Sequence, residues 1–194
     1  PIIDQKKARI KLNWESGATY VLFFGLIRKY KGLELLIRAF NETPLVNQNI
    51  KLYVAGECYE NQKKYTQIVK SLNLDDQVIL DFNFKNTTDI QKLFSASDII
   101  AQTYHKATQS GITPVAYYYQ KPLLVSNIEG LKVPVISDQT GLVVKNKPKS
   151  IAEGIFEILD KKKLDKFSTN MKKASFKYNW NSFSKQWISF ISKL

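Results

Sequence analysis

The chain has 194 residues, 44% of them hydrophobic and 24% charged, which suits one globular domain with a single core and leaves little room for two. No apolar run approaches the roughly 20 residues that a transmembrane helix needs, and the single cysteine, Cys58, excludes an internal disulfide framework and suits a reducing cytoplasm. A net charge of +12 indicates a partner rich in negative charge: nucleic acid, anionic lipid or a phosphorylated small molecule.

The first 18 residues are interpreted as a lead-in to the folded core. The chain begins with Pro1 and not with methionine, and it carries no signal-peptide pattern, so we expect it to start within a longer protein. The core is expected over residues 19–160, followed by C-terminal helices over residues 161–194. No repeat, linker or change of composition divides these parts, so one domain is predicted for residues 1–194.

Short apolar runs alternate with amphipathic stretches through the core, and this alternation is typical of βαβ units around a parallel sheet. A run that is apolar throughout and ends in glycine, as residues 20–25 do, indicates a strand buried on both faces. The predicted strands cover residues 20–24, 51–55, 78–82, 98–102 and 123–126, with a shorter one at 141–144.

The stretches between these runs carry apolar residues at helical spacing. Helices are predicted to begin near Gly32, to cover residues 65–72 and 89–96, and to follow from Pro148. Before the fifth strand, Thr113 is expected to be an N-cap and Pro114 the first helical residue, so a polar loop leads into a helix N-terminus. The predicted fold is α/β: a single Rossmann-like domain, with a parallel β-sheet flanked by helices.

The C-terminal helices carry two further patterns. The lysines at 161–163 and 172–173 are predicted to form a solvated face and not a site. The last helix has more aromatic residues than a surface helix needs, so two roles fit it: it caps this domain, or it docks on a neighbouring one. The apolar residues at helical spacing are Phe183, Trp187, Phe190, Ile191 and Leu194.

Ligands of open parallel sheets bind at the carboxyl ends of the strands, so the loops there are the candidate sites. The first such loop, residues 25–32, lacks both the G-x-G-x-x-G pattern of dinucleotide sites and the G-K-[ST] of P-loops. Its Arg28, Lys29 and Lys31 precede a helix and predict an anion site. The alternative is that they are ordinary surface cations.

Two other loops have groups suited to a nucleotide or a sugar. Thr108, Gln109, Ser110 and Gly111 offer hydroxyl, amide and backbone N–H groups to a phosphate or to sugar hydroxyls, with a simple polar turn as the alternative. After the third strand, residues 82–84 place Phe82, Asn83 and Phe84 where a flat base would stack. For the two phenylalanines, packing in the core is the stronger interpretation.

The only histidine, His105, follows the fourth strand, which favours a catalytic role at first sight. No Ser, Cys or carboxylate is paired with it in the sequence, so a structural or solvent-exposed role is expected. No cluster of Cys, His and Asp has the spacing of metal ligands, and no metal site is predicted.

Several segments in the same order resemble the C-terminal domain of the group 1 glycosyltransferases, which are retaining enzymes of the GT-B fold. They are YVLFFGLIRKYKGLELLIRAF at 20–40, LYVAGE at 52–57, DIQKLFSASDI at 89–99, ATQSGITPVAYYYQKPLLVSNIEGL at 107–131 and TGLVV at 140–144. The resemblance implies that this domain binds a nucleotide diphosphate sugar, with no cofactor and no obligatory metal. It also implies that an N-terminal domain, absent from this chain, binds a saccharide or lipid-linked acceptor.

Carried over position by position, the resemblance places the family's diphosphate-binding lysine at Lys31. The arginine that usually follows the first glycine of that loop is Leu26 here, and Arg28 is its proposed substitute. The family's two glutamates, separated by seven residues, fall on Ala107 and Val115. Recognition of the sugar and ribose hydroxyls must then depend on other groups, such as those of the loop at 108–111.

The leading hypothesis is transfer of a hexose-type sugar from a nucleotide diphosphate donor to a saccharide or lipid-linked acceptor, in bacterial-type polysaccharide biosynthesis. Its location would be cytoplasmic, with the positive charge holding the full enzyme at the inner membrane face. The alternatives are a non-catalytic basic module that binds an anionic membrane, nucleic acid or a protein partner, and a degenerate glycosyltransferase domain. No sequence-specific nucleic acid partner is expected, and catalytic residues cannot be assigned from the sequence.

Overall fold

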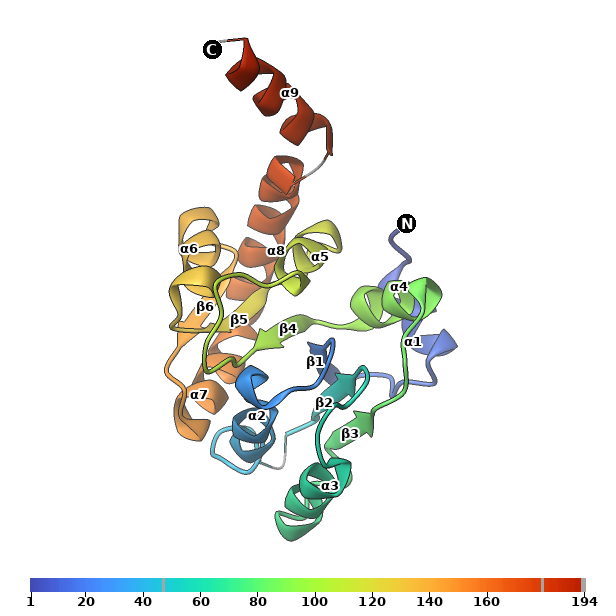
Figure 1. Ribbon diagram of the computed structural model, residues 1–194. Helices are drawn as coiled ribbons and strands as arrows, with labels where there is room; N and C mark the ends of the chain where they lie inside the picture. The colour runs from blue at the N-terminus through green and yellow to red at the C-terminus, as the bar shows by residue number, and fades with distance from the viewer. Residues whose placement is uncertain (47, 179, 193–194) are drawn as a thin grey trace.

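The computed structural model describes residues 1–46, 48–178 and 180–192 (Figure 1). Within these residues, six strands form one sheet in the order β3-β2-β1-β4-β5-β6, and every neighbouring pair is parallel. The predicted α/β fold with a parallel sheet is therefore confirmed. The strands are β1 (Thr19–Phe24), β2 (Ile50–Ala55), β3 (Val78–Asp81), β4 (Ile99–Gln102), β5 (Leu123–Ser126) and β6 (Gly141–Val144).

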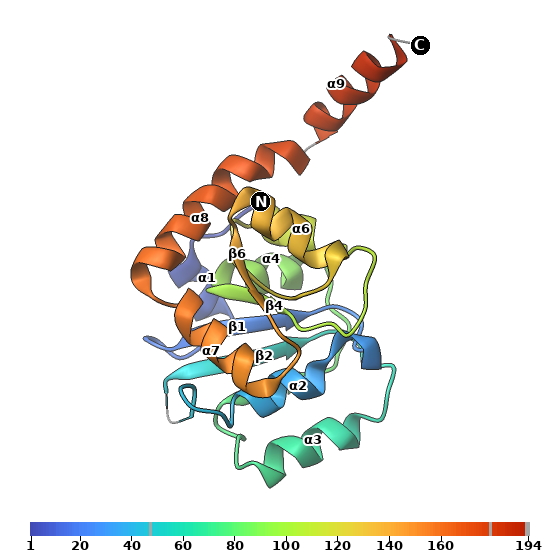
Figure 2. The same ribbon diagram turned by 90° about the vertical axis from the view of Figure 1, so that its left-hand side faces the viewer.

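Helices follow each strand and cover both faces of the sheet (Figure 2). Helices α2, α3 and α7 bury their apolar side chains on one face, and α4, α5 and α6 bury theirs on the other. The helices are α1 (Gln5–Lys11), α2 (Leu33–Ala39), α3 (Gln62–Ser71), α4 (Thr87–Ala96), α5 (Ile112–Tyr118), α6 (Glu129–Asp138), α7 (Pro148–Ile158), α8 (Lys161–Ser175) and α9 (Trp180–Ile191), with 3-10 turns η1 (Lys29–Lys31) and η2 (Phe176–Tyr178).

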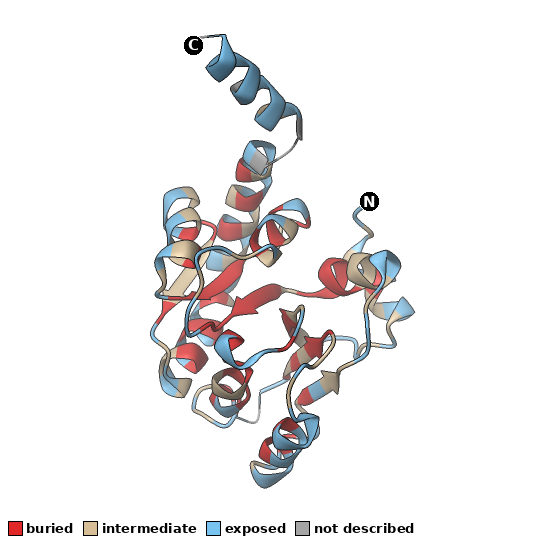
Figure 3. Ribbon diagram, viewed as in Figure 1, coloured by how far each residue is buried: buried red, intermediate tan, exposed pale blue. Residues whose placement is uncertain are grey.

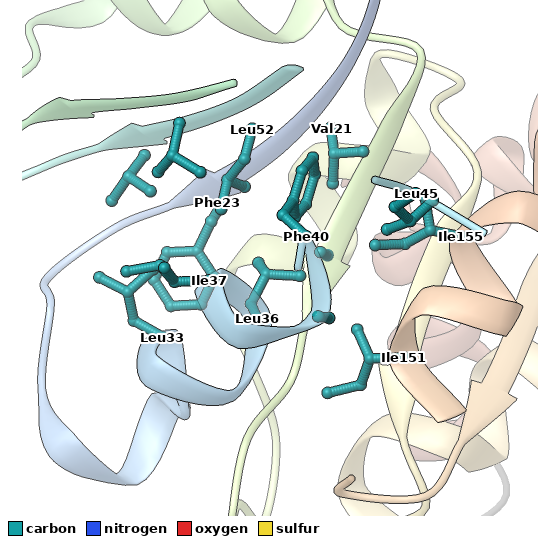
Figure 4. Packing of buried hydrophobic residues seen from close by; sticks show 14 of the residues in the cluster. Val21, Phe23, Leu33, Leu36, Ile37, Phe40, Leu45, Leu52, Ile151 and Ile155 are labelled. Atoms are coloured by element: carbon teal, nitrogen blue, oxygen red, sulfur yellow. The ribbon is translucent and has the colours of Figure 1, made fainter. Parts of the chain in front are cut away.

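Strand β1 forms the centre of the core because its side chains alternate between two apolar clusters. Val21 and Phe23 pack against α2 and α7, whereas Leu22 packs on the opposite face. Figure 4 shows the side chains of α2 directed toward β1, with Ile151 and Ile155 of α7 beside them. Both faces of β1 are thus excluded from water, which is why its sequence is apolar throughout and not alternating.

The pairing of β1 with its two neighbours is unequal. Strand β1 pairs with β2 along six residues, from Thr19 to Phe24, but it pairs with β4 at only two, Val21 and Leu22. The strand order also reverses between β1 and β4, since the chain moves outward from β1 to β3 and then returns to continue on the other side. This junction is the topological switch point at which ligands of such sheets bind.

The lead-in at residues 1–18 is held against the core through α1. Arg9 Nη2 lies 2.6 Å from Asp98 Oδ2, and the same carboxylate oxygen accepts a hydrogen bond from the backbone N–H of Tyr20 at 2.7 Å. Trp14 stacks on Tyr20 with ring centroids 3.9 Å apart. The carboxylate of Asp98 therefore connects α1 with the starts of β1 and β4. It lies at the N-terminal ends of the strands, and the candidate site lies at their carboxyl ends.

Several predicted boundaries differ by one to three residues, and two of these differences concern the candidate site. Strand β3 ends at Asp81, so Phe82 lies in the following loop. Helix α5 begins at Ile112 with Gly111 as its N-cap, so neither Thr113 nor Pro114 has its expected position. The reason is that the Thr113 hydroxyl is buried and donates to Gln102 Oε1 (3.2 Å) at the end of β4, and is therefore not free to cap the helix.

The last helix, α9, does not cap the domain. It extends away from the sheet beyond α8 (Figure 1), and most of its described side chains are exposed (Figure 3). Its exposed large apolar side chains are Phe183, Trp187, Ile188, Phe190 and Ile191, whereas Leu194 lies outside the described residues. The predicted solvated face of α8 is confirmed, since the lysines at 161–163 and 172–173 are exposed. None of the described helices is long and apolar enough to cross a membrane.

Candidate functional site

The loops after β1 and β4 meet at the switch point, where they are joined by backbone contacts. The N–H of His105 donates to the carbonyl of Tyr30 at 2.6 Å. Gly32 adopts a left-handed conformation with φ 66°, and a Cβ there would lie 2.0 Å from the carbonyl oxygen of Thr103. Only glycine allows this approach, so the residue fixes the spacing between the two loops.

Lys31 is the most unusual side chain of the first loop, because it is a buried cation. The residue is only 7% exposed, and its Nζ lies 5.6 Å from the centroid of the Tyr104 ring. Among the described residues, no side chain or carbonyl accepts a hydrogen bond from this ammonium group or forms an ion pair with it. Burial, and after it the nearby charge of Arg28, lowers the pKa of Lys31 to about 8.

The side chain of Lys31 is largely desolvated, but its ammonium group keeps contact with solvent and has no acceptor, so it favours the binding of an anion. The surroundings of Lys31 leave room for such an anion to approach. A Cβ at Gly25 would lie 2.8 Å from Lys31 Nζ, so the glycine keeps this side of the ammonium free of side-chain atoms. The predicted anion site thus has a specific centre, Lys31, whereas Arg28 and Lys29 are exposed.

The loop at 108–111 is held by a hydrogen-bond network that starts at the end of β4. Ser110 Oγ accepts hydrogen bonds from Gln102 Nε2 (2.9 Å) and from the backbone N–H of Ile112 (3.2 Å), and it lies 3.2 Å from the Tyr104 hydroxyl. The hydroxyl of Ser110 therefore positions the loop. Thr108, Gln109 and Gly111 are exposed and remain the residues of this loop that a ligand can reach.

A hollow of about 410 Å³ lies beside this loop, between α5 and α6. Gly130, in the first turn of α6, packs against the loop, since a Cβ there would lie 2.1 Å from the carbonyl oxygen of Thr108. The lining residues are Gln109, Ser110, Gly111, Thr113, Pro114, Gly130 and Pro134. We call it the α5–α6 hollow, and it contains three of the four predicted residues of the loop.

A second hollow, of about 640 Å³, lies among the loops after β1, β2 and β4. We call it the basic hollow; its lining residues are Arg28, Lys29, Tyr30, Tyr59, Glu60, His105 and Lys106. The sequence singled out neither Tyr59, Glu60 nor Lys106 for a site. Tyr59 and Glu60 reach it because Ile27 and Cys58 form an isolated bridge between the first two loops, a long-range contact that no local pattern indicates. His105 is exposed there, in agreement with its expected solvent-exposed role.

The third loop, predicted to bind a base, lines neither hollow. Phe82 is half-buried and lies against Tyr65 of α3, with ring centroids 6.1 Å apart. Asn83 Nδ2 donates to Asp81 Oδ1 at 2.9 Å, and Lys85 Nζ lies 2.6 Å from the same oxygen. Phe84 is 71% exposed, which leaves its ring free to stack. A role of Phe82 and Asn83 in base binding stays a prediction.

The two positions where the family has glutamates carry no polar group. The side chains of Ala107 and Val115 are half-buried and pack against the second apolar cluster. The only carboxylate that lines either hollow is that of Glu60. No group of three or more His, Cys, Asp and Glu residues in the described part of the chain is arranged to hold a metal ion.

A Rossmann-like sheet with a largely buried lysine at its switch point has the chemistry to hold an anionic ligand there. The model of the family "Glycosyl transferases group 1" matches residues 4–177. The chain therefore belongs to the group 1 glycosyltransferases and has the fold of the C-terminal half of a GT-B enzyme.

Known proteins support this assignment. An uncharacterized glycosyltransferase of Methanocaldococcus jannaschii is 25% identical over an alignment of 196 positions, which covers 93% of this chain and 49% of that protein. The C-terminal domain of a group 1 family protein from Francisella tularensis has a TM-score of 0.80 at 22% identity and covers 93% of this chain and 95% of its own. HepE of Anabaena in complex with UDP-glucose has a TM-score of 0.82 at 22% identity, over 98% of this chain and 53% of that one. The chain thus spans about half the length of the first of these proteins.

Proposed function

We propose that this chain is the donor-binding half of a glycosyltransferase and holds the diphosphate of a nucleotide sugar at Lys31. The observation that carries the proposal is Lys31, a residue only 7% exposed at the switch point, whose ammonium group keeps contact with solvent and has no acceptor among the described residues. Arg28 and the exposed groups of the loop at 108–111 would contact the rest of the diphosphate and the sugar. The solved complexes of HepE with UDP and with UDP-glucose make a uridine nucleotide the first donor to test.

The proposed reaction transfers a hexose-type sugar, with retention of configuration, to a saccharide or lipid-linked acceptor held by another half of the protein. Negative charge grows on the departing diphosphate in the transition state, and fixed cations stabilise it there more than in the ground state. Lys31 and Arg28 supply that positive charge, so the proposal needs no cofactor or metal. In this proposal, the enzyme acts in polysaccharide biosynthesis, in the cytoplasm of a bacterial-type cell.

The first test is a thermal-shift screen of the chain with UDP, GDP, ADP and CMP and with their sugars. A ligand at ten times its Kd stabilises a protein by about 1.4 kcal/mol. For a domain of this size, that corresponds to a rise in Tm of about 3–5 °C. We expect one nucleotide family to give this shift and the others none, and we expect no sugar transfer by the chain alone. Equal or absent shifts with all four would contradict the proposal, and transfer by the chain alone would contradict its claim of inactivity.

A contact of the full enzyme with an anionic membrane is a second proposal, favoured by the C-terminal helices. Helix α9 exposes Trp187 and Phe190, and α8, which precedes it in the chain, exposes several lysines; aromatic rings with basic residues are the usual combination at a membrane interface. We expect the chain to sediment with vesicles that contain phosphatidylserine in 50 mM salt and to be released in 500 mM salt, because salt screens the attraction. Vesicles of phosphatidylcholine alone are the control, and equal binding to both would overturn the proposal.

A further inference from the structure

The basic hollow has an unusual balance of charge. Its lining includes three basic side chains, those of Arg28, Lys29 and Lys106, and the imidazole of His105. None of the three cations forms an ion pair with any residue that the structure describes, although ion pairs occur elsewhere on the molecule. Because like charges placed together are unfavourable, this arrangement favours a ligand that brings negative charge.

Glu60 is the single carboxylate of the hollow, and it is already engaged. Its Oε2 accepts a hydrogen bond from the hydroxyl of Tyr65 at 3.1 Å, which ties it to α3. One carboxylate cannot neutralise three cations, so the hollow keeps a net positive charge.

The hollow is also built before any ligand binds. The N–H of Tyr59 donates to the carbonyl of Ile27 (3.1 Å), and the N–H of His105 donates to that of Tyr30 (2.6 Å), so all three loops are joined through their backbones. The guanidinium of Arg28 lies over the ring of Tyr59, 4.8 Å from its centroid. Because these groups are already positioned, the entropic cost of ordering them when a ligand binds is small.

The hollow adjoins the place proposed for the diphosphate and shares only Arg28 with it. Lys31 does not line it, and its Nζ is directed toward Gly25, near the side chain of Ile112. A diphosphate held by Lys31 and Arg28 would leave Lys29 and Lys106 of the hollow without a partner. A neutral sugar would not satisfy them either, because its hydroxyls gain most from carboxylates, and Ala107 and Val115 provide none. A carboxylate or phosphate forms charge-assisted hydrogen bonds with lysine and arginine, which are about twice as strong as neutral ones.

We propose that the basic hollow binds a second anionic group, the carboxylate or phosphate of an acidic sugar, in addition to the diphosphate of the donor. This inference rests on the proposed function and narrows its substrate class to acidic or phosphorylated sugars. The sugar can belong to the donor or to the acceptor, since both would lie beside the diphosphate. The chemistry of recognition is the same in the two cases.

The donor case is tested by calorimetry with UDP-glucuronate and UDP-glucose, or with GDP-mannuronate and GDP-mannose if the screen selects GDP. The acceptor case is tested with free glucuronate, glucose 6-phosphate and glucose, added to the chain saturated with the selected nucleoside diphosphate. In one of the two arms we expect the acidic ligand to bind about tenfold more tightly than the neutral one, which corresponds to about 1.4 kcal/mol. The arm that shows the preference identifies the source of the anion.

The double variant Lys29→Gln/Lys106→Gln removes two charges from the hollow and leaves Lys31 in place. It should lose the preference and keep the affinity for the nucleoside diphosphate. The matched control, Lys161→Gln/Lys162→Gln, removes the same charge from the exposed face of α8 and should keep the preference. No preference in either arm, a preference that survives in the double variant, or its loss in the control would overturn the inference alone. If no nucleoside diphosphate binds at all, the proposed function fails as well.

Discussion

Replacement of Lys31 by methionine is expected to weaken the binding of a nucleoside diphosphate by about 1.5–3 kcal/mol, the range for a hydrogen bond to a charged group. The ammonium is partly desolvated and has no acceptor among the described residues, so a bound phosphate would be its partner. Methionine preserves the apolar part of the side chain, and the loss would therefore report the charge and not a cavity. Titration calorimetry of the wild type and the variant with UDP measures the difference.

Two further variants make this test specific. Lys31→Ala should lose at least as much affinity, whereas Lys161→Met, on the exposed face of α8, should lose none. Lys31→Met should also unfold at a higher urea concentration than the wild type, since it removes a desolvated charge. Loss of binding together with gain of stability cannot be explained by misfolding. Unchanged affinity in Lys31→Met would remove Lys31 from the site.

The pKa of Lys31, about 8, adds a dependence on pH to the same prediction. A phosphate binds the ammonium form, so binding should raise this pKa back toward its usual value near 10.4. Affinity should therefore fall as pH rises through 8, by about tenfold between pH 7 and pH 9. In Lys31→Met the fall should be absent. A wild-type affinity that does not change over this range would contradict the proposed contact.

Substitution of Gly32 by alanine is expected to lower the free energy of unfolding by about 4 kcal/mol or more, a loss that single substitutions reach only through severe strain. Gly32 has a positive φ of 66°, and its new Cβ would lie 2.0 Å from the carbonyl oxygen of Thr103. Backbone atoms of the loops after β1 and β4 would have to separate. Urea unfolding measures the loss, and nucleotide binding at low urea should fall with it.

Gly17 provides the matched control, because it also has a positive φ, 85°, but no atom lies within 4 Å of the position its Cβ would take. Gly17→Ala should cost only the conformational penalty, about 1–2 kcal/mol. The difference between the two variants then measures the steric contact of Gly32 with Thr103. Equal losses in the two variants would show that this contact does not hold the loops together.

The sheet could be predicted from the sequence because its signals are local. The apolar run of β1 and the helical spacing of Leu33, Leu36 and Ile37 each arise within a single strand or helix. The buried side chains of such an element recur at a regular spacing in the sequence. The start of α5 was predicted wrongly because Thr113 satisfies a local rule for N-caps but is bound by Gln102, eleven residues earlier. A tertiary hydrogen bond overrides the cap there.

The candidate site could be predicted only in part, for the same reason. Lys31 and the loop at 108–111 follow strands, and the resemblance to the family indicates them. The basic hollow is lined by residues of three loops, among them Tyr59 and Lys106, which only the tertiary fold brings together. No spacing in the sequence predicts that contact. The position of α9 was also beyond prediction, since an apolar helical face looks the same whether it covers its own domain or extends away from it.

The short pairing between β1 and β4 has a mechanical consequence. Only two residues of β1 pair with β4, across the switch point, whereas six residues of β1 pair with β2 on its other side. Lys31 belongs to the group of strands on the β1 side of the switch point, and the loop at 108–111 belongs to the group on the β4 side. A nucleotide sugar that contacts both would link the two groups of strands across the shortest strand pairing of the sheet. Binding would then also stabilise the domain.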